Sequence, residues 1–321
     1  MKLTVAIPTY NRAELLKGLL ENLSHQISEH VEVVICDNCS PDHTREVCTA
    51  FPFVKYYRNS ENIGGANNVL KVVELANGDY CWIIGDDDRI RSGGIEAVLN
   101  ATEHGTDIIY VNQSYEAGSY DNIDEIKGSV LCSRRESGLL SSGQIVGNYV
   151  NTSALFTSVS SMVFKTSVFK EGFKGYIDEP LFTSLYSTFP HSLILSKSII
   201  KKPVYYIGYP YMAFYVGAQE WIGDWPYLNL IRVLELSDEF QKHGASREFL
   251  RKYRGEVFKS SAEPYYELLK NKHHKFSPYF SRSAMIRKYS IYPAFRKLEF
   301  DVMKRMFKER VKAALGLTHF L

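Results

Sequence analysis

The sequence contains no long uninterrupted hydrophobic run. None of its apolar stretches approaches the roughly 20 residues that a membrane-spanning helix requires. Residues 1–8 also lack the apolar core and the small-residue cleavage site of a secretory signal peptide. We therefore expect a cytoplasmic protein that does not span a membrane.

Cysteine is sparse, and the common phosphate-binding loops are missing. Five cysteines in 321 residues are too few, and odd in number, for a disulfide framework. Cys36 and Cys39 have C-x-x-C spacing, but no second pair or histidine cluster completes a zinc site. Neither the glycine pattern of dinucleotide-binding folds nor that of P-loops occurs, and residues 8–12, which follow the first apolar run, contain no glycine. Any phosphate group must therefore be bound in another way.

Charge is nearly balanced, with a net value of +2, but it is unevenly distributed. Residues 281–321 carry ten Lys or Arg and only three Asp or Glu, so the rest of the chain is acidic overall. An acidic body without a recognised nucleic-acid motif argues against a nucleic-acid partner. The hydrophobic content of 45% is that of a globular protein, and the length suffices for one large or two ordinary domains.

The apolar pattern alternates between strand and helix. Runs that predict strands lie at residues 3–7, 31–36, 54–57, 80–84 and 107–111, and helical spacing lies between them at residues 13–23, 44–50, 66–76 and 95–104. Such alternation predicts an α/β fold with a mostly parallel central sheet flanked by helices. Residues 159–164 and 203–209 predict later strands. Beyond residue 226 the pattern becomes helical and predicts helices at residues 227–243 and 247–271.

Three consecutive carboxylates follow one of the predicted strands. Asp86, Asp87 and Asp88 repel one another unless a cation lies among them, and Mg²⁺ prefers such oxygen ligands. A solvated acidic turn is the alternative. Residues 9–11 and Asp37 also follow strands, and ligands of parallel sheets bind beyond the carboxyl ends of the strands. We therefore expect a nucleotide or another phosphorylated ligand at this edge.

Four motifs resemble those of one enzyme family. They are VAIPTYNR at residues 5–12, VVICDNCS at 33–40, NIGG at 62–65 and GDDD at 85–88. Their order and spacing over roughly the first 110 residues resemble inverting glycosyltransferases of family 2, which have the GT-A fold. The form WIIGDDD resembles the abequosyltransferase-like branch, which acts in bacterial surface polysaccharide synthesis. One departure is Gly85, because many members carry an aspartate at that position.

The resemblance implies a sugar donor activated by a nucleoside diphosphate. Tyr10 would stack on the nucleobase, and Asp37 would accept a hydrogen bond from it. Mg²⁺ or Mn²⁺, held by Asp88 and Asp86, would neutralise charge on the departing diphosphate. The residues implied to bind the donor are Pro8, Thr9, Tyr10, Asn11, Asp37, Asn62, Gly64, Asp86 and Asp87.

Inverting transfer needs a general base for the acceptor hydroxyl. The resemblance implies an Asp or Glu near the start of a helix, for which Asp178 and Glu179 are the candidates, and His191 is a third. Asp178 would alternatively cap that helix, and His191 would be a structural histidine. The implied acceptor contacts, each with ordinary packing as its alternative, are Ser160, Ser161 and Trp221.

Residues 295–315 predict an amphipathic helix. Its basic side carries Lys297, Lys304, Lys308 and Lys312, and its apolar side carries Phe295, Leu298, Val302 and Met306. Such a helix either lies on an anionic membrane surface or packs on its own domain with a solvated basic face. Membrane contact would suit an enzyme with a lipid-linked acceptor at the inner face of the cytoplasmic membrane.

The predicted function is therefore transfer of a sugar, with inversion, from a nucleotide donor to a saccharide acceptor in O-antigen, capsule or related glycan synthesis. One alternative is a sugar-nucleotide nucleotidyltransferase, although the first loop lacks the glycines and basic residues usual there. Another is a non-catalytic glycan- or nucleotide-binding module, which would gain little from three adjacent carboxylates. We expect a catalytic domain at residues 1–218, with its nucleotide half at 1–112 and its acceptor half at 113–218, and a helical region at 219–321.

Overall fold

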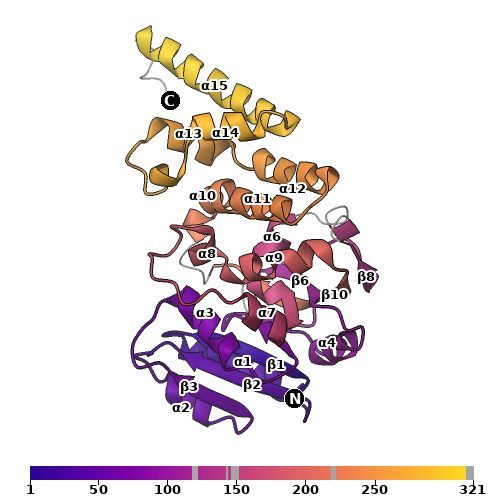
Figure 1. The fold of residues 1–321 in the computed structure, drawn as a ribbon. Coiled ribbons are helices and arrows are strands. Elements are labelled where there is room, and N and C mark those ends of the chain that lie inside the picture. Colours follow the sequence, from indigo (N-terminus) through magenta and orange to yellow (C-terminus); the bar gives the residue numbers. More distant parts are fainter. Residues whose placement is uncertain (118–121, 142–143, 146–151, 218–221, 316–321) are drawn as a thin grey trace.

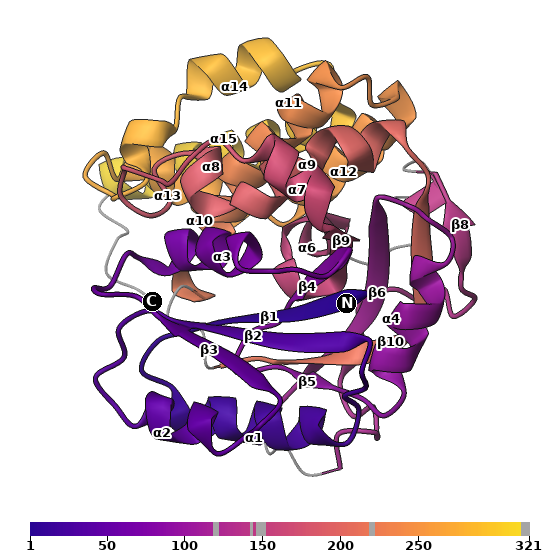
Figure 2. The same cartoon turned by 60° about the horizontal axis from the view of Figure 1, so that its bottom comes forward.

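A ten-stranded sheet forms the centre of the fold (Figures 1 and 2). The computed structural model describes residues 1–117, 122–141, 144–145, 152–217 and 222–315. The hydrogen-bonded order is β3-β2-β1-β4-β9-β6-β10-β5, and β7 and β8 pair with β6 and β10. The strands are β1 (Leu3–Thr9), β2 (Val31–Asp37), β3 (Val54–Arg58), β4 (Tyr80–Ile83), β5 (Arg89–Ile90), β6 (Ile108–Glu116), β7 (Ser129–Val130), β8 (Gly138–Leu140), β9 (Met162–Lys165) and β10 (Val204–Tyr215).

The strands β3, β2, β1 and β4 are parallel to one another, as predicted from the strand–helix alternation. Their carboxyl ends therefore share one edge of the sheet. β6 and β10 are also parallel, whereas β9 enters antiparallel between β4 and β6. The predicted strand at 159–164 begins later than expected, because residues Val159–Ser161 form a 3-10 turn before β9.

Helices cover both faces of the sheet (Figure 2). Along β1, Leu3, Val5 and Ile7 face one hydrophobic core, and Ala6 faces the other, as the two-residue period of a strand requires. The first core contains α1 (Ala13–Ser24), α2 (Thr44–Thr49) and α4 (Gly94–Thr102). The second contains α3 (Gly65–Glu74) and most of the later helices.

The later helices extend the second core away from the sheet (Figure 1). They are α6 (Thr152–Thr157), α7 (Thr166–Gly172), α8 (Leu185–Thr188), α9 (Pro190–Lys201), α10 (Trp225–Leu228), α11 (Leu234–Lys242), α12 (Arg247–Lys259), α13 (Ala262–Lys270), α14 (Arg282–Tyr289) and α15 (Pro293–Ala314), with short turns at Ile222–Asp224 and Ser277–Tyr279. One apolar core thus runs from β1 to α15 across the predicted boundary at residue 218. No helix of the described part of the chain is long and apolar enough to cross a membrane.

The helical region is broken more often than its sequence pattern predicts. A π-helical turn, Asn229–Val233, separates α10 from α11 within the predicted helix at 227–243. The predicted helix at 247–271 is two helices, α12 and α13, that meet at Ser261. Pro264 explains the break, because its ring and missing N–H cannot lie inside a continuous helix.

Gly78 marks a close approach between the turn before β4 and the backbone of β1. A Cβ at this position would lie 2.7 Å from the Thr4 nitrogen and 2.8 Å from the Leu3 carbonyl carbon. Backbone atoms at that distance cannot yield without moving the strand. We expect Gly78→Ala to lower the free energy of unfolding by about 1–3 kcal/mol, measured by urea denaturation.

Gly255→Ala is the matched control, because Gly255 lies in α12 and nothing except its chain neighbours and the backbone of its own helix lies within 4 Å of its would-be Cβ. Removing a helical glycine there should raise stability by roughly 0.5–1 kcal/mol. Equal effects of the two substitutions would contradict this account of the packing between β1 and β4.

Candidate active site

The polar residues that follow β1, β2 and β4 meet at one edge of the sheet. The Thr9 hydroxyl donates a hydrogen bond of 2.8 Å to Asp86 Oδ2. The backbone amide of Asn38 donates a hydrogen bond to the Thr9 carbonyl at 2.9 Å, which joins the loop after β2 to the end of β1. The parallel topology thus brings together residues that are far apart in the sequence.

The acidic residues occupy a tight turn directly after β4. The Asp88 amide donates to the Gly85 carbonyl at 3.0 Å, which closes the turn. A Cβ at position 85 would lie 2.7 Å from Asp87 Oδ1 and 3.1 Å from Asp88 Oδ2. Glycine at this position therefore leaves room for the carboxylates to pack against the turn.

All three aspartates are buried, so the charged form of each carboxylate is less stable than it would be in water. Burial raises the pKa of Asp86 to about 6; the Arg12 guanidinium opposes this rise, and the charge of Asp87 adds to it. Arg12 Nη1 lies 3.1 Å from Asp86 Oδ1 and 3.4 Å from Asp87 Oδ2. Arg12 thus supplies positive charge to two of the three carboxylates.

Asp88 is the least compensated member of the turn. Its Oδ2 accepts a hydrogen bond of 2.7 Å from Ser160, whereas its buried Oδ1 has no hydrogen-bond partner among the described residues. Burial, followed by the charge of Asp87, raises the pKa of Asp88 well above its usual range. An unpaired carboxylate oxygen in a buried site is costly, and a bound cation would remove that cost.

The turn suits a cation that takes its remaining ligands from a substrate. No group of three or more His, Cys, Asp or Glu side chains within the described residues is arranged to hold a metal ion. Mg²⁺, however, is usually held by one or two carboxylates together with waters and substrate phosphates. The unpaired Oδ1 of Asp88 and the neighbouring carboxylate of Asp86 fit this smaller role.

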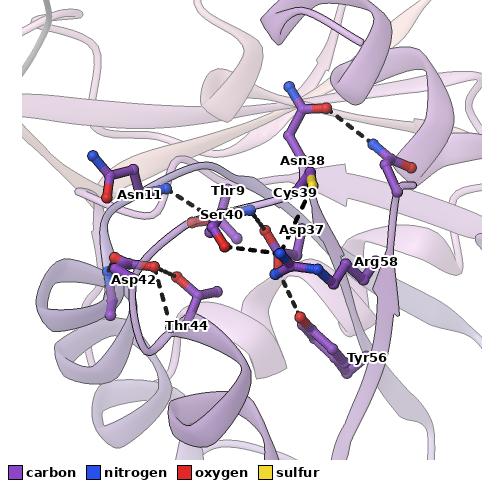
Figure 3. Close-up of polar contacts among 12 residues, drawn as sticks. Thr9, Asn11, Asp37, Asn38, Cys39, Ser40, Asp42, Thr44, Tyr56 and Arg58 are labelled. Atoms are coloured by element: carbon purple, nitrogen blue, oxygen red, sulfur yellow. Dashed lines mark hydrogen bonds and ion pairs between the residues drawn. The ribbon is translucent and has the colours of Figure 1, made fainter. Parts of the chain in front are cut away.

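Asp37 organises the loop after β2 (Figure 3). Its Oδ1 accepts a hydrogen bond from the Ser40 amide at 2.8 Å. Its Oδ2 accepts from the Tyr56 hydroxyl at 2.5 Å and from Arg58 Nη1 at 2.6 Å. Asp37 is fully buried and both of its oxygens are engaged, so it holds this loop in shape. A nucleobase would have to displace one of these contacts to reach it.

The loop after β1 presents Tyr10 to solvent. Tyr10 is 44% exposed, which leaves a ring face available for stacking, whereas the neighbouring Pro8 is half-buried. Asn11 takes a left-handed conformation with φ of 56°, which asparagine tolerates better than most residues. The backbone amide of Asn11 donates a hydrogen bond to the Ser40 hydroxyl at 2.9 Å, so the loops after β1 and β2 hold each other in place.

A network of asparagines connects these loops to α3. Asn38 donates to Asn62 Oδ1 at 2.7 Å and accepts hydrogen bonds from the Asn59 side chain and the Ile63 amide. The Gly64 amide also donates to Asn62 Oδ1, at 2.9 Å. Asn62 and Gly64, both predicted to bind the donor, therefore lie beside the loop of Asp37. The sequence signal for this network is a cluster of asparagines at residues 59–68.

The candidate base segment lies beside the first turn of α3. Asn67 accepts a hydrogen bond from the Ile177 amide at 2.7 Å and donates to the Ile177 carbonyl at 3.0 Å. It also donates to the Ile63 carbonyl at 3.0 Å. Asp178, the next residue after Ile177, is exposed, so this contact brings it to the same end of the sheet as Asn62 and Gly64.

The expectation that Asp178 and Glu179 stand near the start of a helix is wrong. Residues 173–184 form an irregular segment, and α8 begins only at Leu185. Ser184 caps that helix by accepting a hydrogen bond from the Ser187 amide, so Asp178 is not the cap. The Glu179 carboxylate accepts a hydrogen bond from Ser184 and is thereby engaged within the segment.

Arg232 fixes the far end of this segment and was not found by sequence reasoning. It is almost fully buried in the π-helical turn and donates to the Phe182 carbonyl at 3.0 Å and to the Thr183 carbonyl at 2.5 Å. Its Nη1 also bonds both oxygens of Glu235 at 2.8 Å. Phe182 is held in a left-handed conformation, with φ of 71°, that most side chains avoid.

The remaining predicted residues lie in three different settings. His191 is buried in α9 with Nε2 3.2 Å from the Thr157 carbonyl, and burial lowers its pKa to about 4. Ser160 touches Asp88, whereas the Ser161 hydroxyl donates to the carbonyls of residues 155 and 158, away from the acidic turn. Trp221 lies outside the described residues.

Comparison with known proteins identifies relatives of this chain. The sequence profile of glycosyl transferase family 2 matches residues 4–173. An abequosyltransferase from Salmonella typhimurium is 36% identical over 146 residues, or 43% of this chain and 37% of that protein. A GalNAc(5)-diNAcBac-PP-undecaprenol β-1,3-glucosyltransferase from Campylobacter jejuni is 27% identical over 116 residues, or 35% of this chain and 38% of that protein. Each match thus spans little more than a third of the relative's length.

Solved structures show the same fold. The crystal structure of TarS residues 1–349 from S. aureus, in complex with UDP-GlcNAc, gives a TM-score of 0.57. The alignment covers 95% of this chain and 81% of that chain at 16% identity. At this identity the likeness concerns the fold alone, and it confirms the GT-A architecture predicted from the sequence.

The raised pKa of Asp88 makes a prediction about stability. An acid whose pKa is raised by folding stabilises the folded state below its unfolded pKa, and that stability is lost as the pH rises through the folded pKa. We expect Asp88→Asn to raise the free energy of unfolding at pH 7, because the amide carries no charge that burial would penalise. Thermal unfolding of the ligand-free protein measures this change.

The stabilisation by Asp88→Asn should grow as the pH rises above about 4, the pKa of the unfolded carboxyl, because the unfolded chain then loses a proton that the folded wild type retains. It should level off once the pH exceeds the raised pKa of the folded carboxyl. Asp79→Asn is the control, because Asp79 is mostly exposed and its ion pair with Lys2 spans 3.9 Å. A pH-independent loss of stability in Asp88→Asn would show that the carboxylate is well compensated in the ligand-free protein.

Proposed function

The chain belongs to glycosyl transferase family 2, and we propose that it transfers a sugar from a nucleoside diphosphate donor to a saccharide acceptor. One observation carries the proposal: the buried turn of Asp86–Asp88, with an unpaired oxygen on Asp88, lies at the same sheet edge as the exposed ring of Tyr10. This arrangement suits a ligand that has an aromatic base at one end and a charged diphosphate at the other.

In the proposed donor complex, Tyr10 stacks on the base, and the loops of Asn11, Asn62 and Gly64 line the base and ribose. Asp88 and Asp86 hold a divalent ion, Mg²⁺ or Mn²⁺, together with the diphosphate. The bound ion supplies Lewis-acid stabilisation of the departing nucleoside diphosphate. Arg12, which already lies against Asp86 and Asp87, keeps the turn in shape while the ion is absent.

We propose Asp178 as the general base of an inverting transfer. Its position is supported by the hydrogen bonds of Asn67 to Ile177, which hold the adjacent backbone beside α3. Glu179 is less suited, because its carboxylate already accepts a hydrogen bond from Ser184. His191 is also less suited, since it is buried and its lowered pKa makes it a weak base near neutral pH.

The proposed acceptor is a lipid-linked saccharide of a bacterial surface glycan. The relative from Campylobacter jejuni is named for an undecaprenol-linked acceptor, and the one from Salmonella typhimurium for abequose transfer. Such an acceptor would bring this chain to the cytoplasmic face of a membrane. Ser160 lies against the acidic turn and would approach the acceptor side of the site.

Donor binding can be measured by thermal shift with UDP, GDP, CDP and dTDP, each with and without Mn²⁺. A ligand at 100 times its Kd should raise stability by about 2.7 kcal/mol. We expect one nucleotide to give a shift that grows with Mn²⁺, and Asp88→Asn to lose the Mn²⁺-dependent part. Asp79→Asn should behave as the wild type. A full metal response in Asp88→Asn would remove Asp88 from the metal site.

The base is tested by comparing Asp178→Asn with Glu179→Gln. We expect Asp178→Asn to lower kcat about 10²–10⁴-fold, because the acceptor hydroxyl loses its proton acceptor. Its nucleotide thermal shift should be unchanged, since donor binding does not use this residue. Glu179→Gln should retain most activity. The opposite ranking of the two variants would assign the base to Glu179.

A further inference from the structure

Helix α15 has two apolar sides, and one of them packs against the rest of the protein. Phe295, Leu298 and Val302 are buried in the second core, so the side predicted to be apolar packs on the domain. Glu299 pairs with Arg282, and Glu309 accepts hydrogen bonds from other side chains of the helical region. This side of the helix therefore cannot meet a membrane.

A second apolar stripe faces outward on the same helix. Phe300 is 64% exposed and Phe307 is 68% exposed, and Val311 is also exposed. Residues seven and eleven positions apart fall on one side of an α-helix, so these three side chains form a single stripe. Isolated exposed hydrophobic residues are normal, but two phenylalanines on one stripe of a highly charged helix need a reason.

Lysines accompany the exposed phenylalanines. Lys304 and Lys308 are exposed on the same side of α15, and the Lys304 ammonium lies 5.9 Å from the centre of the Phe300 ring. Two acids lie beside these lysines and both are paired: Asp301 with Lys297 at 2.8 Å, and Glu309 with Arg305 at 3.3 Å. Phe300, Lys304, Phe307, Lys308 and Val311 thus form a basic and aromatic surface, called here the α15 outer surface.

We propose that the α15 outer surface docks on an anionic lipid bilayer. Aromatic side chains favour the membrane interface, and lysines at its level attract anionic headgroups. Charge decides against a second copy of this chain as the occupant, since two such surfaces would bring their lysines together. This proposal rests on the proposed function for its purpose, which is to bring the enzyme to a lipid-linked acceptor. The experiment that tests it does not depend on that acceptor.

The surface lies apart from the nucleotide site. α15 is at the end of the molecule remote from the sheet, beyond α12 and α13 (Figure 1). Docking through it would leave the carboxyl edge of the sheet uncovered. Lipid binding and nucleotide binding can therefore be measured separately on the same protein.

The test is co-sedimentation of the full chain with vesicles of phosphatidylcholine, with or without 30 mol% phosphatidylglycerol. We expect binding only to the anionic vesicles, and weaker binding as the salt concentration rises. Phe300→Ala/Phe307→Ala and Lys304→Gln/Lys308→Gln should each weaken that binding at least 10-fold. Leu139→Ala and Lys17→Gln replace exposed residues of the same kinds elsewhere and should bind as the wild type.

The lipid proposal fails if the wild type does not bind anionic vesicles, or if the double variants bind as well as the wild type. It also fails if sedimentation equilibrium shows a dimer that Phe300→Ala/Phe307→Ala converts to a monomer, which would assign the surface to a second copy. Nucleotide thermal shifts should be unchanged in both double variants. Failure of vesicle binding with intact nucleotide shifts would overturn this inference and leave the proposed transferase in place.

Discussion

Burial of three adjacent carboxylates at the end of β4 is the constraint on which the site depends. Like charges in a low-dielectric setting raise one another's pKa unless positive charge or hydrogen-bond donors offset them. The surroundings of the turn supply both, through the hydroxyls of Thr9 and Ser160 and the guanidinium of Arg12. The compensation is incomplete at Asp88, whose Oδ1 has no hydrogen-bond partner among the described residues, and a bound cation would remove this residual cost. The ligand-free site is therefore held in a state that favours binding.

The position of the candidate site at one edge of the sheet could be predicted from the sequence, because it depends only on the order and direction of the strands. Strand–helix alternation makes β1 to β4 parallel, and parallel strands bring the residues that follow them together whatever their side chains are. The hydrogen bond between Thr9 and Asp86, which are 77 positions apart, is a consequence of this rule. The antiparallel entry of β9 could not be predicted in the same way, since its order in the sheet depends on packing between distant segments. The pattern of its residues is the same in either direction.

The details of the candidate site follow from side-chain contacts that leave no periodic signal. Asn38, Asn62 and Asn67 connect two loops and the candidate base segment, but each is an ordinary loop or helix residue in the sequence. At the base segment, the expected helix start came from the family resemblance, and it agreed with aspartate being a preferred helix cap. The true start has Ser184 as its cap, and Arg232 holds the end of the irregular segment before it through the carbonyls of Phe182 and Thr183.

Helix α15 shows how a correct periodicity can still hide a surface. Its wheel places the buried residues on one side, and the structure confirms that side as the packed one. On a helical wheel the exposed phenylalanines lie among the lysines. A wheel that is divided into one apolar half and one basic half therefore overlooks them. Their position has a physical consequence for the proposed lipid contact. A lysine-rich surface beside the acidic turn would compete with the metal ion for the diphosphate, whereas at the remote end of the molecule it can attract anionic lipid without disturbing the charge balance of the site.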